Sequence, residues 1–179
     1  MMNFKWIKYL IIVFCLFLLT LFQHSFLPFF TFKKIVPNLT FAFFLVIIFF
    51  LEKKQNKPLF YFLEIIFYSL VAGFLLDFFS FLESGVYPLF FLITGFLIGK
   101  LRSLLRDRED GVFSIDFLFV CIPPFLIYFL FKLIFLSEYY LFVILELMYD
   151  FIFVLIFYSI FKRIYNFYLR RSHFLKLYD

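Results

Sequence analysis

The chain has 179 residues, of which 66% are apolar, and its mean hydropathy is +1.06. Soluble domains are closer to half apolar, and a water-exposed surface on a chain of this length could not cover so much Phe, Leu and Ile. Composition therefore excludes a soluble globular domain. The net charge of +5 indicates loops on the cytoplasmic side of a membrane, not a nucleic-acid partner.

Six continuous apolar runs follow one another along the chain. A helix needs about 20 mainly apolar residues to cross the hydrocarbon core, and spanning β-strands are excluded because these runs do not alternate. The sequence predicts an all-α polytopic membrane protein, a six-transmembrane-helix bundle, with the whole chain 1–179 as a single integral membrane domain. The expected spans are residues 9–30, 35–51, 58–76, 84–99, 113–136 and 139–161.

The basic residues are distributed unequally between the two sides of this bundle. If the N-terminus is inside, 14 of the 17 Lys and Arg residues fall on the inside, and only Lys33, Lys34 and Lys132 fall outside. The positive-inside rule therefore places both termini in the cytoplasm and favours six spans over five or seven. Lys132 could also extend to the outer headgroups. The basic, aromatic tail 162–179 is expected to be either an interfacial helix along the inner headgroups or a simple stop-transfer tail.

Five acidic residues lie in or at the edge of the apolar runs: Glu64, Asp77, Asp116, Glu146 and Asp150. A charge at mid-bilayer is costly, so such residues usually face protein or water. Glu146 and Asp150 are four residues apart and so share one helix face. We favour acids that face the bundle and are protonated or hydrogen-bonded to neighbouring helices; a proton or cation path is the alternative.

The sequence contains no recognisable catalytic pattern. His24 and His173 fall on opposite sides of the predicted membrane, and there is no H-E-x-x-H motif, G-x-S-x-G elbow or P-loop. Cys15 and Cys121 both lie within apolar runs, far from any C-x-x-C spacing. We therefore expect a protein that is not an enzyme and has no catalytic, cofactor-binding or metal-binding residues.

Small residues in the third and fourth runs indicate close helix packing. Ser69, Ala72 and Gly73 share one helix face, and Gly95 and Gly99 have the small-x-x-x-small spacing of a second such face. Small side chains allow two helix backbones to approach each other. The region is predicted to form a packed helical hairpin.

The connection between these two runs contains Asp77 and Gly85. The flanking spans are somewhat short, which suggests that this turn dips into the outer leaflet. Backbone groups at that depth must be satisfied internally, and an aspartate carboxylate can accept N–H bonds from a loop or cap the next helix. We expect Asp77 to have this role.

Several short motifs have the spacing of a known membrane family. Pro37-Asn38-Leu39 opens the second span, Gly73-Phe74-Leu75-Leu76-Asp77 ends the third, and Ser80 and Gly85 follow at the family's offsets. Leu21-Phe22-Gln23 with Pro28 is similar to the family's opening motif. In these features the chain resembles the rod shape-determining protein MreD family. The family-motif and packing positions are Pro37, Asn38, Leu39, Gly73, Asp77, Gly85, Gly95 and Gly99.

The resemblance implies a non-enzymatic scaffold of the bacterial cell-elongation machinery in the cytoplasmic (inner) membrane. The partners it implies are an MreC-like bitopic protein, MreB, RodA and a class B penicillin-binding protein. It also implies an architecture like that of the six-helix substrate-binding subunits of energy-coupling-factor transporters. A vitamin-binding subunit of such a transporter is the alternative function, although the single tryptophan, Trp6, lies at the cytoplasmic edge and not in an outer pocket.

Overall fold

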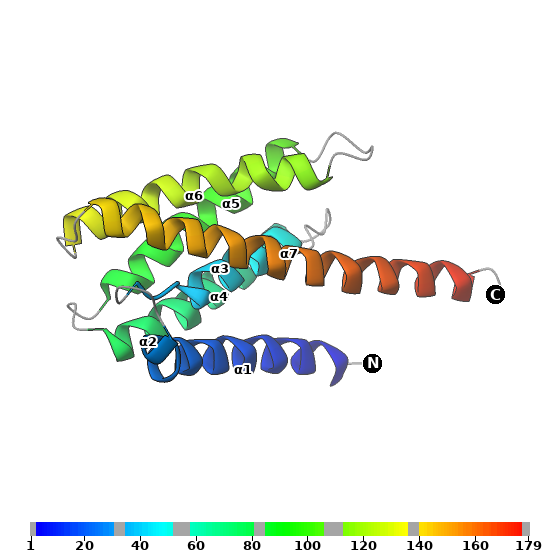
Figure 1. The fold of residues 1–179 in the computed structure, drawn as a ribbon. Helices are drawn as coiled ribbons and strands as arrows, with labels where there is room; N and C mark the ends of the chain where they lie inside the picture. Colours follow the sequence, from blue (N-terminus) through cyan, green and yellow to red (C-terminus); the bar gives the residue numbers. More distant parts are fainter. Residues whose placement is uncertain are drawn as a thin grey trace.

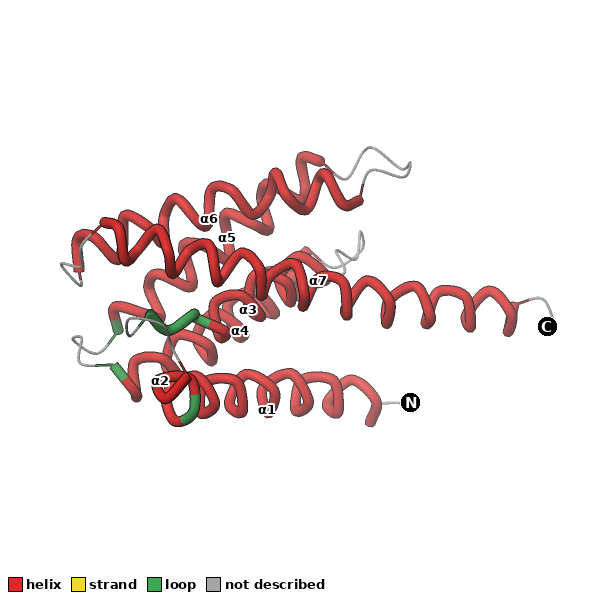
Figure 2. Tube along the Cα trace, in the orientation of Figure 1, coloured by secondary structure: helices red, strands yellow, loops and turns green. Residues whose placement is uncertain are grey.

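The computed structural model describes residues 3–30, 35–51, 58–80, 85–105, 113–135 and 140–176. All regular structure within these ranges is α-helical (Figure 2), so the predicted all-α class is confirmed. The helices are α1 (Asn3–Ser25), α2 (Leu27–Phe30), α3 (Leu39–Phe50), α4 (Pro58–Phe79), α5 (Val86–Leu105), α6 (Phe113–Phe135) and α7 (Tyr140–Lys176).

Five helices of the described chain are long and apolar enough to cross a membrane: α1, α4, α5, α6 and α7. Their outward faces carry large apolar side chains, among them Leu10, Phe60, Phe119 and Leu126, each of which is at least 60% exposed. A continuous surface of this kind is stable where lipid tails cover it and not where water does. The chain is therefore a polytopic helical membrane protein.

The sixth apolar helix, α3, forms the centre of the bundle. Every residue from Leu39 to Phe49 is buried, and α3 packs against α1, α4, α5 and α7 (Figure 1). Its 12 residues are about 18 Å long, less than the ~30 Å hydrocarbon core, because residues 35–38 of the predicted span are not helical. The second predicted span is thus a short core helix enclosed by five longer helices.

Both ends of the described chain lie at the same end of the bundle (Figure 1). In the order α1, α3, α4, α5, α6 and α7, successive helices run in opposite directions, so α1, α4 and α6 end at the other end of the bundle. This arrangement is what an even number of passes produces. Which end faces the cytoplasm remains a prediction from the charges.

Helices α4 and α5 form the most extensive helix pair, and glycines lie where they meet. A Cβ atom added to Gly73 would lie 2.4 Å from the Cα atom of Pro88. At the other end of the pair, a Cβ on Gly95 would lie 2.6 Å from Ser69 Oγ, and one on Gly99 would lie 2.8 Å from an Ile65 methyl group. The absence of side chains at these positions is what lets the two helices approach so closely.

Helix α5 is longer than the predicted fourth span, residues 84–99. It has 20 residues and continues past Gly99 through the charged segment to Leu105. In this extension the Arg102 guanidinium donates to the carbonyl of Leu51 and lies 5.3 Å from the centre of the Phe49 ring. The added residues of α5 lie at its C-terminal end, away from the turn between α4 and α5, so the expected dip of this turn into the outer leaflet stays a prediction. Residues 81–84 of that turn lie outside the described residues.

Helix α7 is a single helix of 37 residues and reaches well beyond the rest of the bundle (Figure 1). At 1.5 Å per residue it is about 55 Å long, nearly twice the hydrocarbon thickness. Residues 162–176 continue the membrane-spanning axis, so the prediction of a separate interfacial helix along the headgroups was wrong. The reason is that the segment contains no Gly or Pro at which the helix could bend sharply.

The replacement of Gly73 by Ala is expected to destabilise the protein by about 2 kcal/mol, because the added methyl group meets the backbone of α5 and cannot be relieved by a rotamer change. Thermal unfolding of the purified protein in detergent measures this effect. Phe74→Leu is the matched control, since Phe74 is the next residue of α4 and is 58% exposed. Equal unfolding temperatures for Gly73→Ala and Phe74→Leu would contradict the close contact.

Candidate functional site

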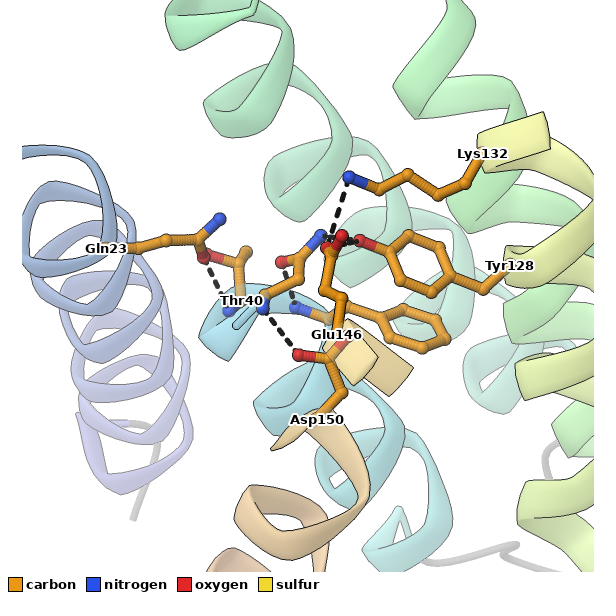
Figure 3. A network of polar contacts seen from close by, with 8 residues as sticks. Gln23, Thr40, Tyr128, Lys132, Glu146 and Asp150 are labelled. Carbon is orange, nitrogen blue, oxygen red and sulfur yellow. Dashed lines mark hydrogen bonds and ion pairs between the residues drawn. The ribbon is translucent and has the colours of Figure 1, made fainter. Parts of the chain in front are cut away.

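The N-terminus of α3 is buried inside the bundle, and polar side chains from other helices bind its backbone. Asp150 of α7 accepts the Asn38 backbone N–H through Oδ1 at 2.5 Å. Gln23 of α1 accepts the Thr40 N–H at 3.3 Å, and the Asn38 side chain itself accepts the Phe41 N–H at 2.9 Å. Figure 3 shows Gln23, Thr40 and Asp150 converging at this point.

These contacts solve a problem that every helix start has in an apolar environment. The first N–H groups of a helix have no partner within the helix, and each one left unsatisfied in hydrocarbon costs several kcal/mol. The Leu39 N–H is bound by the Pro37 carbonyl and the Ala42 N–H by the Asn38 carbonyl. Each backbone N–H from residue 38 to residue 42 therefore has a partner. The Asp150 carboxylate also lies at the positive end of the α3 dipole.

A second set of contacts extends this cluster from α3 to α6 and α7. The Asn38 side-chain amide donates to the Tyr128 hydroxyl at 3.0 Å, and that hydroxyl donates to Glu146 Oε1 at 2.8 Å. The Lys132 ammonium lies 3.1 Å from the same Glu146 oxygen (Figure 3). Lys132 is only 9% exposed, so the expectation that it extends to the outer headgroups was wrong. Its charge instead compensates a buried carboxylate in the bundle.

Helix α1 joins the cluster through hydroxyl groups. Thr20 Oγ1 lies 2.9 Å from Thr40 Oγ1 and also donates to the carbonyl of Leu16 at 2.8 Å. All three side chains are fully buried. The complete cluster, which we call the α3 N-terminal cluster, comprises Thr20, Gln23, Asn38, Thr40, Tyr128, Lys132, Glu146 and Asp150.

The acidic side chains of the bundle contact residues of other helices. Glu146 and Asp150 do share one face, as predicted, and both are hydrogen-bonded within the bundle. A third acid, Glu64 of α4, accepts a hydrogen bond from the hydroxyl of Tyr9 on α1. Within the described residues no group of three His, Cys, Asp or Glu side chains is arranged to hold a metal ion. The favoured expectation, acids that connect helices, agrees with these contacts. Asp150 Oδ2 is buried without a hydrogen-bond partner among the described residues.

Asp77 connects the end of α4 to the start of α5. Its carboxylate accepts the N–H of Gly85, and the other oxygen accepts the N–H of Tyr87 at 3.1 Å. Gly85 has φ of 100°, which favours glycine. A carboxylate at this position satisfies unpaired donors and faces the positive end of α5. The geometry is the capping role expected of Asp77, although α4 continues two residues further, to Phe79.

The predicted motif residues belong to two separate assemblies. Pro37, Asn38 and Leu39 form the start of α3, in the α3 N-terminal cluster. The other motif residues belong to the α4–α5 pair. Gly73, Gly95 and Gly99 lie where the two helices touch, and Asp77 and Gly85 connect them. Sequence reasoning missed Tyr128, Thr20 and the partner of Lys132. A signal was present for Lys132, because a single basic residue in an apolar run usually has an acidic partner, and Glu146 and Asp150 lie in the next run.

A family model described as rod shape-determining protein MreD matches residues 4–168 of the chain. The chain belongs to the MreD family. Comparison with curated proteins and comparison with solved structures each give no significant match. The MreD match begins in α1 and ends in α7, so it includes both the α3 N-terminal cluster and the Asp77 cap. This MreD-family chain is thus a rod shape-determining membrane protein.

The replacement of Asp150 by Ala is expected to destabilise this MreD-family protein by about 3 kcal/mol, because the Asn38 N–H is left buried without an acceptor. Asp150→Asn retains an acceptor oxygen and should cost clearly less. Ser159→Ala is the control on the same helix, since the Ser159 hydroxyl is exposed and donates only to its own helix. Thermal unfolding in detergent tests the order, and an Asp150→Ala variant as stable as Ser159→Ala would refute the role of the cap.

Proposed function

We propose that this protein is a non-enzymatic scaffold of the cell-elongation machinery in the bacterial inner membrane. In this role it would bind an MreC-like bitopic protein and help to couple MreB filaments to peptidoglycan synthesis by RodA and a class B penicillin-binding protein. The observation that supports the proposal is the family match over residues 4–168. Contact between membrane proteins is the activity that such a chain can perform with helix surfaces alone.

The use of the polar side chains also supports a scaffold. The acids that could take part in chemistry bind backbone donors or other side chains: Asp77 caps α5, Asp150 binds the start of α3, and Glu146 binds Tyr128 and Lys132. Contacts of this kind fix helices relative to one another. A fixed bundle presents a constant surface to a partner and loses little entropy on binding.

The charge distribution supports an orientation with both termini in the cytoplasm. The end of the bundle that holds both termini is the end to which 14 of the 17 basic residues are assigned. In this orientation the Asp77 cap and the α3 N-terminal cluster lie toward the outer leaflet. The extension of α7 beyond residue 161 then enters the cytoplasm, where MreB filaments are located.

A reporter enzyme that is active only in the cytoplasm should be active when fused after Asp179. The reason is that six alternating passes return the C-terminus to the side of the N-terminus. The same reporter fused after Phe135 should be inactive, because α6 ends at the opposite end of the bundle. Activity of the second fusion and not of the first would invert the proposed orientation.

The purified protein should retain an MreC-like bitopic protein from the same host in a pull-down from detergent-solubilised membranes. Asp77→Ala should retain several-fold less of it at equal expression, because loss of the cap loosens the junction of α4 and α5. Lys100→Gln, an exposed change on α5 far from this junction, should retain the wild-type amount. Equal recovery with all three proteins would show that partner binding does not depend on the Asp77 cap.

Depletion of the protein in a rod-shaped host should produce rounded cells, and wild-type protein should restore the rod. Cells that stay rod-shaped after depletion would contradict the scaffold proposal. Saturable, tight binding of a small vitamin by the purified protein would instead support the alternative of a transporter substrate-binding subunit. The two assays therefore distinguish the two functions.

A further inference from the structure

A shallow groove of about 410 Å³, open along its length, lies on an exposed face of α7. The side chains that line it recur at intervals of three and four residues, which places them on one side of the helix. Most are branched aliphatic, and the series ends in a positive charge. The lining residues are Ile152, Leu155, Ile156, Ser159, Ile160 and Arg163.

The length of the groove matches one leaflet of a bilayer. Eleven residues of helix separate Ile152 from Arg163, which at 1.5 Å each is about 17 Å, close to half of the ~30 Å hydrocarbon thickness. The apolar run of α7 ends at Phe161, and Lys162 and Arg163 follow at once. Arg163 is therefore placed at the level of the lipid headgroups, and the aliphatic part of the groove extends from there toward the middle of the bilayer.

The two basic residues at this level differ in their surroundings. The Lys162 ammonium lies over the Tyr158 ring, 5.7 Å from its centre, and the side chain is half-buried. Arg163 is exposed and has no acidic partner among the residues that the structure describes. A guanidinium binds a phosphate through two parallel hydrogen bonds, which suits an unpaired arginine at the headgroup level.

We propose that this groove binds one anionic phospholipid, with an acyl chain against Ile152, Ile156 and Ile160 and the phosphate on Arg163. A partner helix fits this face less well. The close backbone approach seen between α4 and α5 needs Gly, Ala or Ser, whereas this face carries large aliphatic side chains. The one small polar residue of this face, Ser159, donates a hydrogen bond to the Leu155 carbonyl of its own helix at 2.8 Å, so its hydroxyl hydrogen is not available to another helix. The site depends on α7 alone and not on the proposed scaffold function; in the proposed orientation its lipid comes from the inner leaflet.

The test is lipid binding to the delipidated, detergent-solubilised full chain, measured by native mass spectrometry. Phosphatidylglycerol should bind about fivefold more tightly than phosphatidylcholine with the same acyl chains. Both lipids carry the phosphate, but the quaternary ammonium of choline repels the guanidinium and leaves phosphatidylcholine without net charge, a difference of about 1 kcal/mol at one basic residue. Arg163→Gln should abolish this preference, and Arg163→Lys should restore part of it. Lys100→Gln removes a charge from the same end of the bundle, away from the groove, and should leave the preference unchanged.

A second variant tests the acyl-chain part of the site. Ile156→Trp fills the groove and should weaken the binding of both lipids while the headgroup preference remains. Inorganic phosphate alone should not compete, because the acyl chain supplies part of the binding energy. Equal preferences in the wild type and Arg163→Gln, equal losses in Arg163→Gln and Lys100→Gln, or full competition by phosphate would each overturn the proposal. So would an Ile156→Cys variant that crosslinks to a partner helix in native membranes.

Discussion

The buried start of α3 is the constraint on which the rest of the bundle depends. A helix that begins inside a low-dielectric environment must have its first N–H groups bound by protein, because neither water nor lipid can bind them. Here the acceptors come from three sources: Gln23 on α1, Asn38 within the turn itself and Asp150 on α7. The positions of α1 and α7 around the central helix are fixed by the same contacts that make the central helix possible.

The Lys132–Glu146 pair follows from this arrangement. Asp150 brings a carboxyl group to the start of α3, and Glu146 adds a second one a single turn away on α7. Two carboxylates so close together repel each other, and the Lys132 ammonium reduces that repulsion. Tyr128 connects the two halves, since its hydroxyl accepts from Asn38 and donates to Glu146. The cluster is therefore one unit, in which the loss of one member affects the others.

Composition and run length were enough to predict the helical class and the long helices, because lipid accepts only apolar surface. The spacing of small residues predicted the glycine contacts, because backbones that approach closely accept only small residues. The pairing of Tyr128 could not be predicted. It is one of 12 tyrosines, and nothing in its apolar run distinguishes it from an aromatic residue that faces lipid. Hydropathy also could not predict that α3 is the buried central helix. It measures how apolar a segment is, and not whether lipid or protein surrounds that segment.

Because α7 is one unbroken helix, a small change in its tilt at one end moves the other end by a larger distance. Asp150 is anchored to the core, and 26 residues of helix, about 39 Å, separate it from Lys176 at the far tip. Because no hinge residue interrupts this arm, a tilt of roughly 10° at the anchor would move the tip by about 7 Å. A displacement of the C-terminal end of α7 would likewise be transmitted along the helix to Asp150, which binds the start of α3.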